Sequence, residues 1–205
     1  MSYDSQLQQA VIEELKWEPS VLATDIGVAV DGGIVTLSGH VDSFAQKYAA
    51  EQAATRVKGI KGVAEEIEVQ LAFDKRRTDD QIALAAASRL AWDVSIPQDA
   101  IKVKVEKGWV TLTGQVNWYF EKIAAADNIR KLFGVIGVSN QITIISNVNV
   151  ANISDGIASA LQRAWFFEPR AIEVSTAGSE VILSGSVNSL HDWDLATSIA
   201  WSDPG

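Results

Sequence analysis

Three near-copies of one ten-residue stretch constrain the fold of this 205-residue chain more than any other feature. In each copy apolar side chains alternate with others in the period-2 pattern of a half-buried strand, which predicts the second arm of a β-hairpin. A glycine recurs inside each strand, which indicates a bulge or another backbone pressed close, and we interpret it as the place where a helix lies close over the sheet. The copies are GGIVTLSGHV at 32–41, KGWVTLTGQV at 107–116 and GSEVILSGSV at 178–187, and their structural glycines are Gly39, Gly114 and Gly185.

The residues around the first copy predict the order helix, strand, strand, helix, strand. Pro19 ends a first amphipathic helix, and the glycines after Asp31 supply the turn chemistry of a hairpin. Asp42 is the predicted N-cap of the second helix, and Gly59 stands where a left-handed C-terminal residue belongs. The apolar face of the first helix is Leu7, Val11 and Leu15, and the final strand contains Val63, Ile67, Val69 and Leu71.

The same order returns at a constant offset of 75 residues, with Asn117 as helix cap and Gly134 as helix end. A box of Thr78 and Gln81 is predicted to cap the first helix of this second block. The third block reaches Gly205 at the position of Gly59 and lacks the final strand, either because the sequence is truncated or because another segment or chain supplies the strand. The predicted domains are 1–74, 75–149 and 150–205.

Charge is spread unevenly over these three blocks, although the whole chain carries a net charge of −9. The first block has 5 basic and 12 acidic side chains (−7), the second 10 and 7 (+3), and the third 2 and 7 (−5). An acidic total argues against nucleic acid as the main partner, and only the middle block suits an anionic surface. The chain has no cysteine, which excludes disulfides and thiolate chemistry.

The N-terminal residues lack the basic region and apolar run of a signal peptide, and no apolar run is long enough to span a membrane. The sequence as written therefore predicts a cytoplasmic protein without a transmembrane segment. It predicts a periplasmic one if an export signal has been removed.

The strand motif V-T-L-[ST]-G, the repeated element order and the Gly-Val pairs at Gly62 and Gly137 resemble the BON domain, a family named for bacterial osmotic-shock and nodulation proteins. The resemblance covers nearly the whole chain as three copies, the third incomplete. It implies an α+β fold of three αββαβ modules, each with a small mixed three-stranded sheet packed with two helices. A right-handed β-α-β step agrees, since it makes the last strand parallel to its partner. The resemblance also implies phospholipid binding and a role in osmotic or envelope stress.

Residues with catalytic or metal-binding chemistry are few. His40 and His191 do not recur between blocks and have no helical ligand spacing, so we expect no catalytic residue, no metal and no cofactor. The carboxylates Glu65, Glu66 and Glu68 are interpreted as a solvated strand edge. The two G-x-x-G sequences that begin at Gly59 and Gly134 are interpreted as helix ends rather than as an RNA-clamping loop.

Tryptophan offers the remaining functional signal, because the chain has seven. Trp17, Trp92 and the Trp165/Phe167 pair recur at the end of each first helix and are predicted to pack in the core or between domains. Two others have no aromatic counterpart in the first block, and they accompany lysines of the basic block. The predicted lipid-contact set is Trp109, Trp118, Lys102, Lys104 and Lys107. Aromatic and basic side chains together suit a membrane interface, whereas packing against a neighbouring block is the alternative.

The sequence therefore predicts a non-enzymatic, stress-associated binding protein with an anionic phospholipid surface as partner. The alternative is an interaction scaffold or holdase-like protein that binds other proteins through exposed aromatic residues and sheet edges. Co-sedimentation with anionic vesicles distinguishes the two hypotheses.

Overall fold

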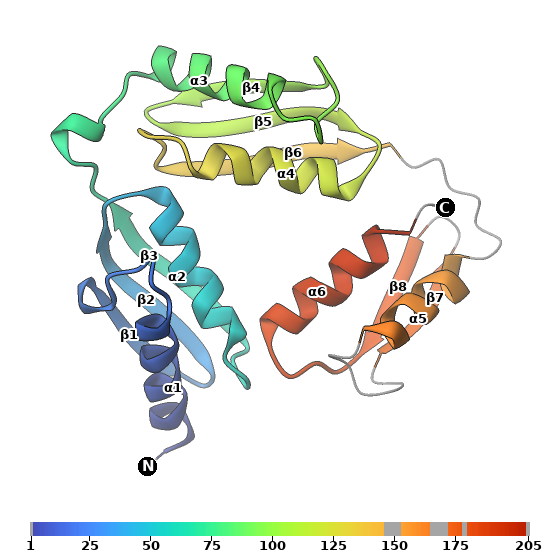
Figure 1. The fold of residues 1–205 in the computed structure, drawn as a ribbon. Coiled ribbons are helices and arrows are strands. Elements are labelled where there is room, and N and C mark those ends of the chain that lie inside the picture. Colours follow the sequence, from blue (N-terminus) through green and yellow to red (C-terminus); the bar gives the residue numbers. More distant parts are fainter. Residues whose placement is uncertain (1, 146–152, 165–171, 178–179, 204–205) are drawn as a thin grey trace.

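The computed structural model describes residues 2–145, 153–164, 172–177 and 180–203, and these form three modules of like architecture (Figure 1). Modules 1 and 2 have the order helix, strand, strand, helix, strand, and module 3 is described as helix, strand, strand, helix. The α+β prediction is confirmed. Module 1 contains α1 (Tyr3–Trp17), η1 (Ala23–Asp25), β1 (Ile26–Asp31), β2 (Ile34–Val41), α2 (Phe44–Arg56) and β3 (Gly62–Val69). After η2 (Phe73–Lys75), module 2 contains α3 (Asp79–Ala91), β4 (Ile101–Glu106), β5 (Trp109–Val116), α4 (Tyr119–Arg130) and β6 (Gly137–Ile144). Module 3 contains α5 (Ile153–Arg163), β7 (Ile172–Ala177), β8 (Glu180–Gly185) and α6 (Leu190–Trp201).

Each sheet is built on the repeated strand. In module 1, β2 lies between β1, its antiparallel hairpin partner, and β3, its parallel partner. In module 2, β5 has the same place between β4 and β6. The parallel pairing confirms the expected crossover through the second helix. In module 3, β8 pairs with β7 and with no other described strand.

The second helices begin one residue later than the sequence predicted. Ser43, not Asp42, is the N-cap of α2, because its hydroxyl accepts the backbone N–H of Gln46. The side-chain oxygen of Gln46 accepts the backbone N–H of Asp42. Asp42, the expected cap, therefore takes part through its backbone and not through its carboxylate. In the same way Trp118 rather than Asn117 occupies the cap position of α4, and Ser189 caps α6. The box of Thr78 and Gln81 at the start of α3 is confirmed.

An aspartate at the start of each first helix holds the hairpin turn in modules 1 and 2. The Asp4 carboxylate accepts the N–H groups of Gly32 and Gly33, both at 3.1 Å. Asp79 accepts those of Lys107 and Gly108 at 2.7 and 2.8 Å. Both turn residues have positive φ in each hairpin, as a type I′ turn requires. The first helix therefore fixes the position of the hairpin tip through two charge-assisted hydrogen bonds.

The glycine within each repeated strand is required by the backbone, as predicted, but not because a helix lies over it. Gly39 and Gly114 have φ of 124° and 143°, a region that side chains rarely adopt. A Cβ at Gly114 would lie 2.1 Å from the carbonyl oxygen of Ala100, and one at Gly39 would lie 2.1 Å from that of Asp25. The closely approaching group is thus the backbone just before the first strand. Gly185 has the same conformation, with φ 150°.

Each module buries its own core between its helices and one face of its sheet. Val35 and Leu37 of β2, and their counterparts in β5, are fully buried. In module 3, Val181 occupies the position of Val35, yet 38% of its surface is exposed, since no described strand pairs with the edge of β8 that faces away from β7. The predicted helix ends are also confirmed, because Gly59 and Gly134 have φ of 87° and 88°.

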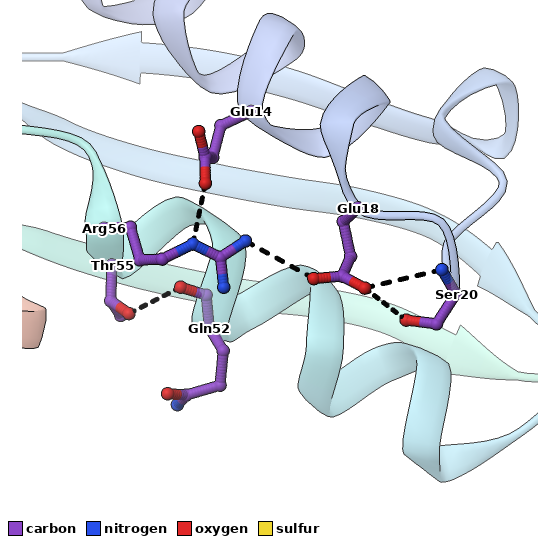
Figure 2. Close-up of polar contacts among 6 residues, drawn as sticks. All are labelled: Glu14, Glu18, Ser20, Gln52, Thr55 and Arg56. Carbon is purple, nitrogen blue, oxygen red and sulfur yellow. Dashed lines mark hydrogen bonds and ion pairs between the residues drawn. The ribbon is translucent and has the colours of Figure 1, made fainter.

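An arginine joins the two helices of module 1. Figure 2 shows Arg56 of α2 between the carboxylates of Glu14 in α1 and Glu18 at the C-cap of α1, with its Nε 2.6 Å from Glu14 and its Nη2 3.4 Å from Glu18. Glu18 also accepts the Ser20 hydroxyl at 2.8 Å, and this bond is the main reason that its pKa lies below the ordinary value. Both helices thus keep one relative position over the sheet.

Side chains from one module also enter the core of another. Leu190 of α6 packs against the core of module 1, and Phe44 of α2 packs against the core of module 2. In Figure 1 the three second helices, α2, α4 and α6, lie on the sides of their modules that face the region between the modules. The three modules therefore contact one another along these helices.

Candidate functional site

The sheet of module 2 has one face against its helices and one face open to solvent. Strand alternation places Lys102, Lys104 and Glu106 of β4 on the open face, where all three are exposed. Their cross-strand partners in β5 are Thr113, Thr111 and Trp109. This open face, which we call the outer face of module 2, therefore presents two lysines in a row of small polar side chains and one large aromatic ring.

Trp109 rests on a glycine of the neighbouring strand. It pairs in register with Gly137 of β6, and a Cβ on Gly137 would lie 2.3 Å from the indole ring. The ring therefore lies flat over the glycine backbone, in the way an aromatic side chain commonly covers a strand glycine. About half of its surface (49%) stays exposed. The expectation that Trp109 packs on a neighbouring module is not met, because its described seat is in its own sheet.

Lysine and tryptophan come close on this face. Lys104 and Trp109 are diagonal neighbours in the antiparallel pair, which places their Cβ atoms roughly 7–8 Å apart. Lys104 forms an ion pair with Glu106 at 3.0 Å, but both side chains are exposed, so the pair contributes little and leaves the ammonium accessible. Lys107 is exposed at the hairpin tip, next to this face.

Trp118 does not join this group. It follows the far end of β5, at the N-cap of α4, while Trp109 begins the same strand. Seven strand residues at about 3.3 Å each separate the two ends by roughly 23 Å. The structure therefore brings together Lys102, Lys104 and Trp109, adds Lys107 at their border, and leaves Trp118 apart.

The equivalent outer face of module 1 has different chemistry. Ala29 stands where module 2 has Lys104, and Ile34 stands where it has Trp109. On β3 the outward residues include Glu66 and Glu68, both exposed, where β6 has Gln141 and Thr143. Asp31 at the end of β1 corresponds to Glu106 at the end of β4, so this acid is common to both faces. The face of module 1 is therefore acidic and lacks the aromatic ring.

The repeated tryptophans are exposed, which contradicts the prediction that they pack in the core or between domains. Trp17, the last residue of α1, is 85% exposed, and Trp92, the C-cap of α3, is 86% exposed, because both follow the last buried leucine of the helix face that meets the sheet. Positions 17 and 92, which are equivalent in the two modules, are therefore both occupied by an exposed tryptophan. Trp165 and Phe167 lie outside the described residues. The signal that sequence reasoning missed is that Trp17 breaks the spacing of Leu7, Val11 and Leu15.

The other residues that the sequence analysis singled out have contacts that stabilise the fold or are simply exposed to solvent. Glu65 forms an ion pair with Lys47 at 2.7 Å and accepts the N–H of Ile67, so it is not part of a purely solvated edge, whereas Glu66 and Glu68 are. Within the described part of the chain, no group of three or more His, Cys, Asp or Glu side chains is placed to hold a metal ion. Gly59 ends α2 and donates its N–H to the carbonyl of Asn188 at 3.0 Å.

None of the helices in the described ranges has both the length and the apolar character needed to cross a bilayer. The chain is similar to the Osmotically-inducible protein Y of Escherichia coli (strain K12), with 29% identity over 143 residues, which cover 68% of this chain and 71% of that protein. Two solved structures of CdsD, a structural protein of the type III secretion system of Chlamydia trachomatis, align with TM-scores of 0.27 at 16% and 15% identity. They cover 95% and 97% of this chain, and 83% and 89% of the CdsD chains, and at this score they carry no weight for fold or function.

The family model of the BON domain matches three stretches, residues 3–70, 78–146 and 149–205. Each match begins near a first helix and runs through the repeated hairpin strand with its glycine, and the first two continue through the parallel third strand. The chain therefore belongs to the BON domain family.

Proposed function

We propose that this protein is a non-enzymatic, stress-associated binding protein that attaches to anionic phospholipid surfaces through the outer face of module 2. The observation that carries the proposal is the placement of Lys102, Lys104 and Trp109 on one solvent-facing sheet surface. The matching surface of module 1 carries Ala29, Ile34 and exposed carboxylates. One module of the pair thus has a surface that anionic lipid attracts, and the other has one that it repels.

The energies suit reversible binding. A lysine near an anionic leaflet contributes about 1 kcal/mol, and the attraction falls off within a Debye length. A half-exposed indole lies well at the level of the lipid headgroups. Two or three lysines with one ring therefore give an attachment that added salt weakens, which fits a peripheral rather than an inserted protein.

The association with osmotic stress rests on similarity. The relative in Escherichia coli is named an osmotically-inducible protein, and the family matches along all three modules. We propose the same class of role here, with domains at 1–74, 75–149 and 150–205 acting as one binding unit. The compartment follows from whether an export signal precedes the mature protein, and the lipid proposal applies to either side of the envelope.

Co-sedimentation with phosphatidylglycerol–phosphatidylcholine vesicles tests the proposal. The charge-reversal variant Lys102→Glu/Lys104→Glu is expected to bind at least about 30-fold more weakly, because two contributions of about 1 kcal/mol each are lost. Binding by the unaltered protein is expected to fall between low and high salt. Lys16→Glu/Lys58→Glu makes the same change in net charge on exposed residues of module 1 and is the matched control. Equal loss in both variants, or no binding at low salt, contradicts the proposal.

A second function is favoured by the exposed tryptophans. Trp17 and Trp92 recur at one surface position of two modules, and repeated exposed aromatic residues are typical of protein-binding sites. In this alternative the protein is a scaffold or holdase-like module. Trp17→Ser/Trp92→Ser is then expected to abolish suppression of the aggregation of a thermally unfolded client protein while vesicle binding stays unchanged. If the parent protein does not suppress aggregation, this second function is wrong.

A further inference from the structure

We propose that the edge of β8 that faces away from β7 binds one extended segment of a partner protein, which lies parallel to β8 and completes the sheet of module 3. This binding is independent of lipid, because it uses module 3 and not the outer face of module 2. In modules 1 and 2 the corresponding edges of β2 and β5 are occupied by β3 and β6. The two complete modules therefore indicate the chemistry of the segment that fits the third.

The free edge of β8 exposes groups that are buried in the other two modules. Among the described strands β8 pairs with β7 alone, and Figure 1 draws a strand beside β8 on that side only. Val181 of β8 is 38% exposed, whereas Val35 and Val110 at the same position are fully buried. The backbone N–H and C=O groups along such an edge are a template to which an extended peptide adds as a further strand.

The second helix of module 3 is incompletely covered as well. Ala200 of α6 is half-buried, whereas the residues at its position in α2 and α4, Ala54 and Ile129, are fully buried. Ala196, one helical turn earlier, is buried against its own sheet, so α6 is already in place. Because α2 and α4 pack on β3 and β6, a third strand would supply the cover that α6 lacks.

The register of β3 and β6 defines the residues that the segment needs. Both strands begin with Gly-Val and bury an isoleucine as their sixth residue, Ile67 or Ile142, each 1% exposed. This isoleucine lies opposite the glycine of the repeated strand. Module 3 has the same glycine, Gly185, with the same positive φ. The sixth residue of the segment therefore lies opposite Gly185, and its first residue lies opposite Glu180.

The fourth residue of the segment is expected to differ from that of β3. In β3 this residue is Glu65, which forms an ion pair with Lys47 of α2 at 2.7 Å. Counted from the helix caps Ser43 and Ser189, the position of Lys47 is occupied in α6 by Trp193, which is 59% exposed. An indole at this position favours an apolar side chain over a carboxylate. The segment that fits module 3 therefore has the pattern Gly-Val-x-apolar-x-Ile.

Fluorescence anisotropy of labelled peptides mixed with the full chain tests this pattern. The probe GVSLQITI is the sequence of β6 with leucine as its fourth residue. It is expected to bind at least about tenfold more tightly than GVSLQSTI, because the isoleucine at the sixth position is buried. It should also bind more tightly than GVSEQITI. Trp193→Lys is expected to reverse the order of these leucine and glutamate peptides, and Trp17→Lys, the same change at an exposed tryptophan of module 1, should leave the order unchanged.

Disulfide trapping tests the direction of the strand, because the chain has no cysteine of its own. Glu180→Cys and Ser186→Cys place a thiol at the start of β8 or just past its end, both at exposed residues roughly 20 Å apart. The peptide CVSLQITI should link at least about tenfold faster to Glu180→Cys than to Ser186→Cys, since only paired residues come within disulfide range. Circular dichroism confirms that both variants are folded.

Four results would overturn the proposal. They are the absence of peptide binding, a linking preference that is equal or reversed, an order of peptides that Trp193→Lys does not change, and a dimer of the chain itself, joined through β8, that excludes the peptide. Sedimentation velocity of the chain alone detects such a dimer.

Discussion

Modules 1 and 2 share a frame and differ in the surface that they display. Val35 and Val110, one repeat apart, are both fully buried, and Gly39 and Gly114 both meet the carbonyl before the first strand. On the opposite face, Ala29 is replaced by Lys104 and Ile34 by Trp109. The comparison teaches that the buried face and the glycine specify the same fold in both modules, while the chemistry of the open face differs between them.

The seat of Trp109 shows how little the frame must change. Gly62 of module 1 already lies beneath Ile34, whose terminal methyl would be 3.2 Å from a Cβ at Gly62. Gly137 has the same place beneath Trp109 in module 2. The glycine seat is therefore present in both modules, and the aromatic ring fills it in one.

Replacing the strand glycine is expected to have the largest effect, and it should be the same in both modules. Gly114→Val forces a branched side chain into positive φ and against the Ala100 carbonyl, so we expect module 2 to lose about 3–5 kcal/mol of stability. Gly39→Val should do the same to module 1. Hydrogen exchange of each sheet, measured by mass spectrometry, checks this. Unchanged protection of β4 to β6 in Gly114→Val would show that the shared frame does not depend on this glycine.

Replacing the aspartate that binds the hairpin turn is expected to have a smaller effect, and one that differs in size between the two modules. Asp79→Asn is expected to cost about 1–2 kcal/mol, because the short charge-assisted bonds to Lys107 and Gly108 lose the carboxylate. Asp4→Asn should cost less, since its two bonds are longer. Thermal unfolding followed by circular dichroism gives the order. Asp80→Asn is the control, as it removes the same charge from the same helical turn while the exposed Asp80 has no bond to the hairpin.

The smallest expected effect is a change in pKa, and it should differ between the two carboxylates that follow the first helices. Glu18 owes its lowered pKa chiefly to the Ser20 hydroxyl, whereas Asp93 owes its own chiefly to the backbone N–H of Ser95. Ser20→Ala should therefore raise the pKa of Glu18, and Ser95→Ala should leave that of Asp93 nearly unchanged. Carboxyl NMR titrations check both.

The sign of the resulting pH dependence follows from the direction of these shifts. A pKa that is lowered in the folded state gives stability that is present above the ordinary carboxyl value and is lost as the pH falls through the lowered one. Removing the Ser20 hydroxyl should therefore reduce stability at neutral pH and leave it unchanged in strong acid. An effect of equal size at both pH values would contradict the hydrogen bond as its cause.

The fold was predictable from sequence because the buried apolar residues recur with a regular spacing. The alternation around Val110 and Leu112 and the constant offset between copies predicted the strands and their order, and Gly59 and Gly134 predicted the helix ends. The predicted cap of α2 was wrong by one residue because Asp42 and Ser43 are both residue types that cap helices well. The structure has Ser43 as the cap, since its hydroxyl accepts the backbone N–H of Gln46 while the Gln46 side chain accepts the N–H of Asp42.

The candidate site was predictable only in part, because exposure has no periodic signature. Alternation was sufficient to place Lys102, Lys104 and Trp109 on one face, whereas Trp118 was grouped with them by sequence proximity alone. Trp17 and Trp92 were assigned to packing because they recur, yet recurrence at a helix end does not show which way the ring points.

The proposal that the outer face of module 2 binds lipid is tested most directly by moving the residues of that face to module 1. The acceptor changes are Gly27→Lys, Ala29→Lys, Ile34→Trp, Glu66→Gln and Glu68→Thr, and the donor changes are Lys102→Glu, Lys104→Glu and Trp109→Ile. In co-sedimentation with anionic vesicles, the donor changes alone should abolish binding, and the two sets together should restore most of it. If the combined variant folds and does not bind, or if the donor changes leave binding intact, the outer face of module 2 is not the lipid-binding surface.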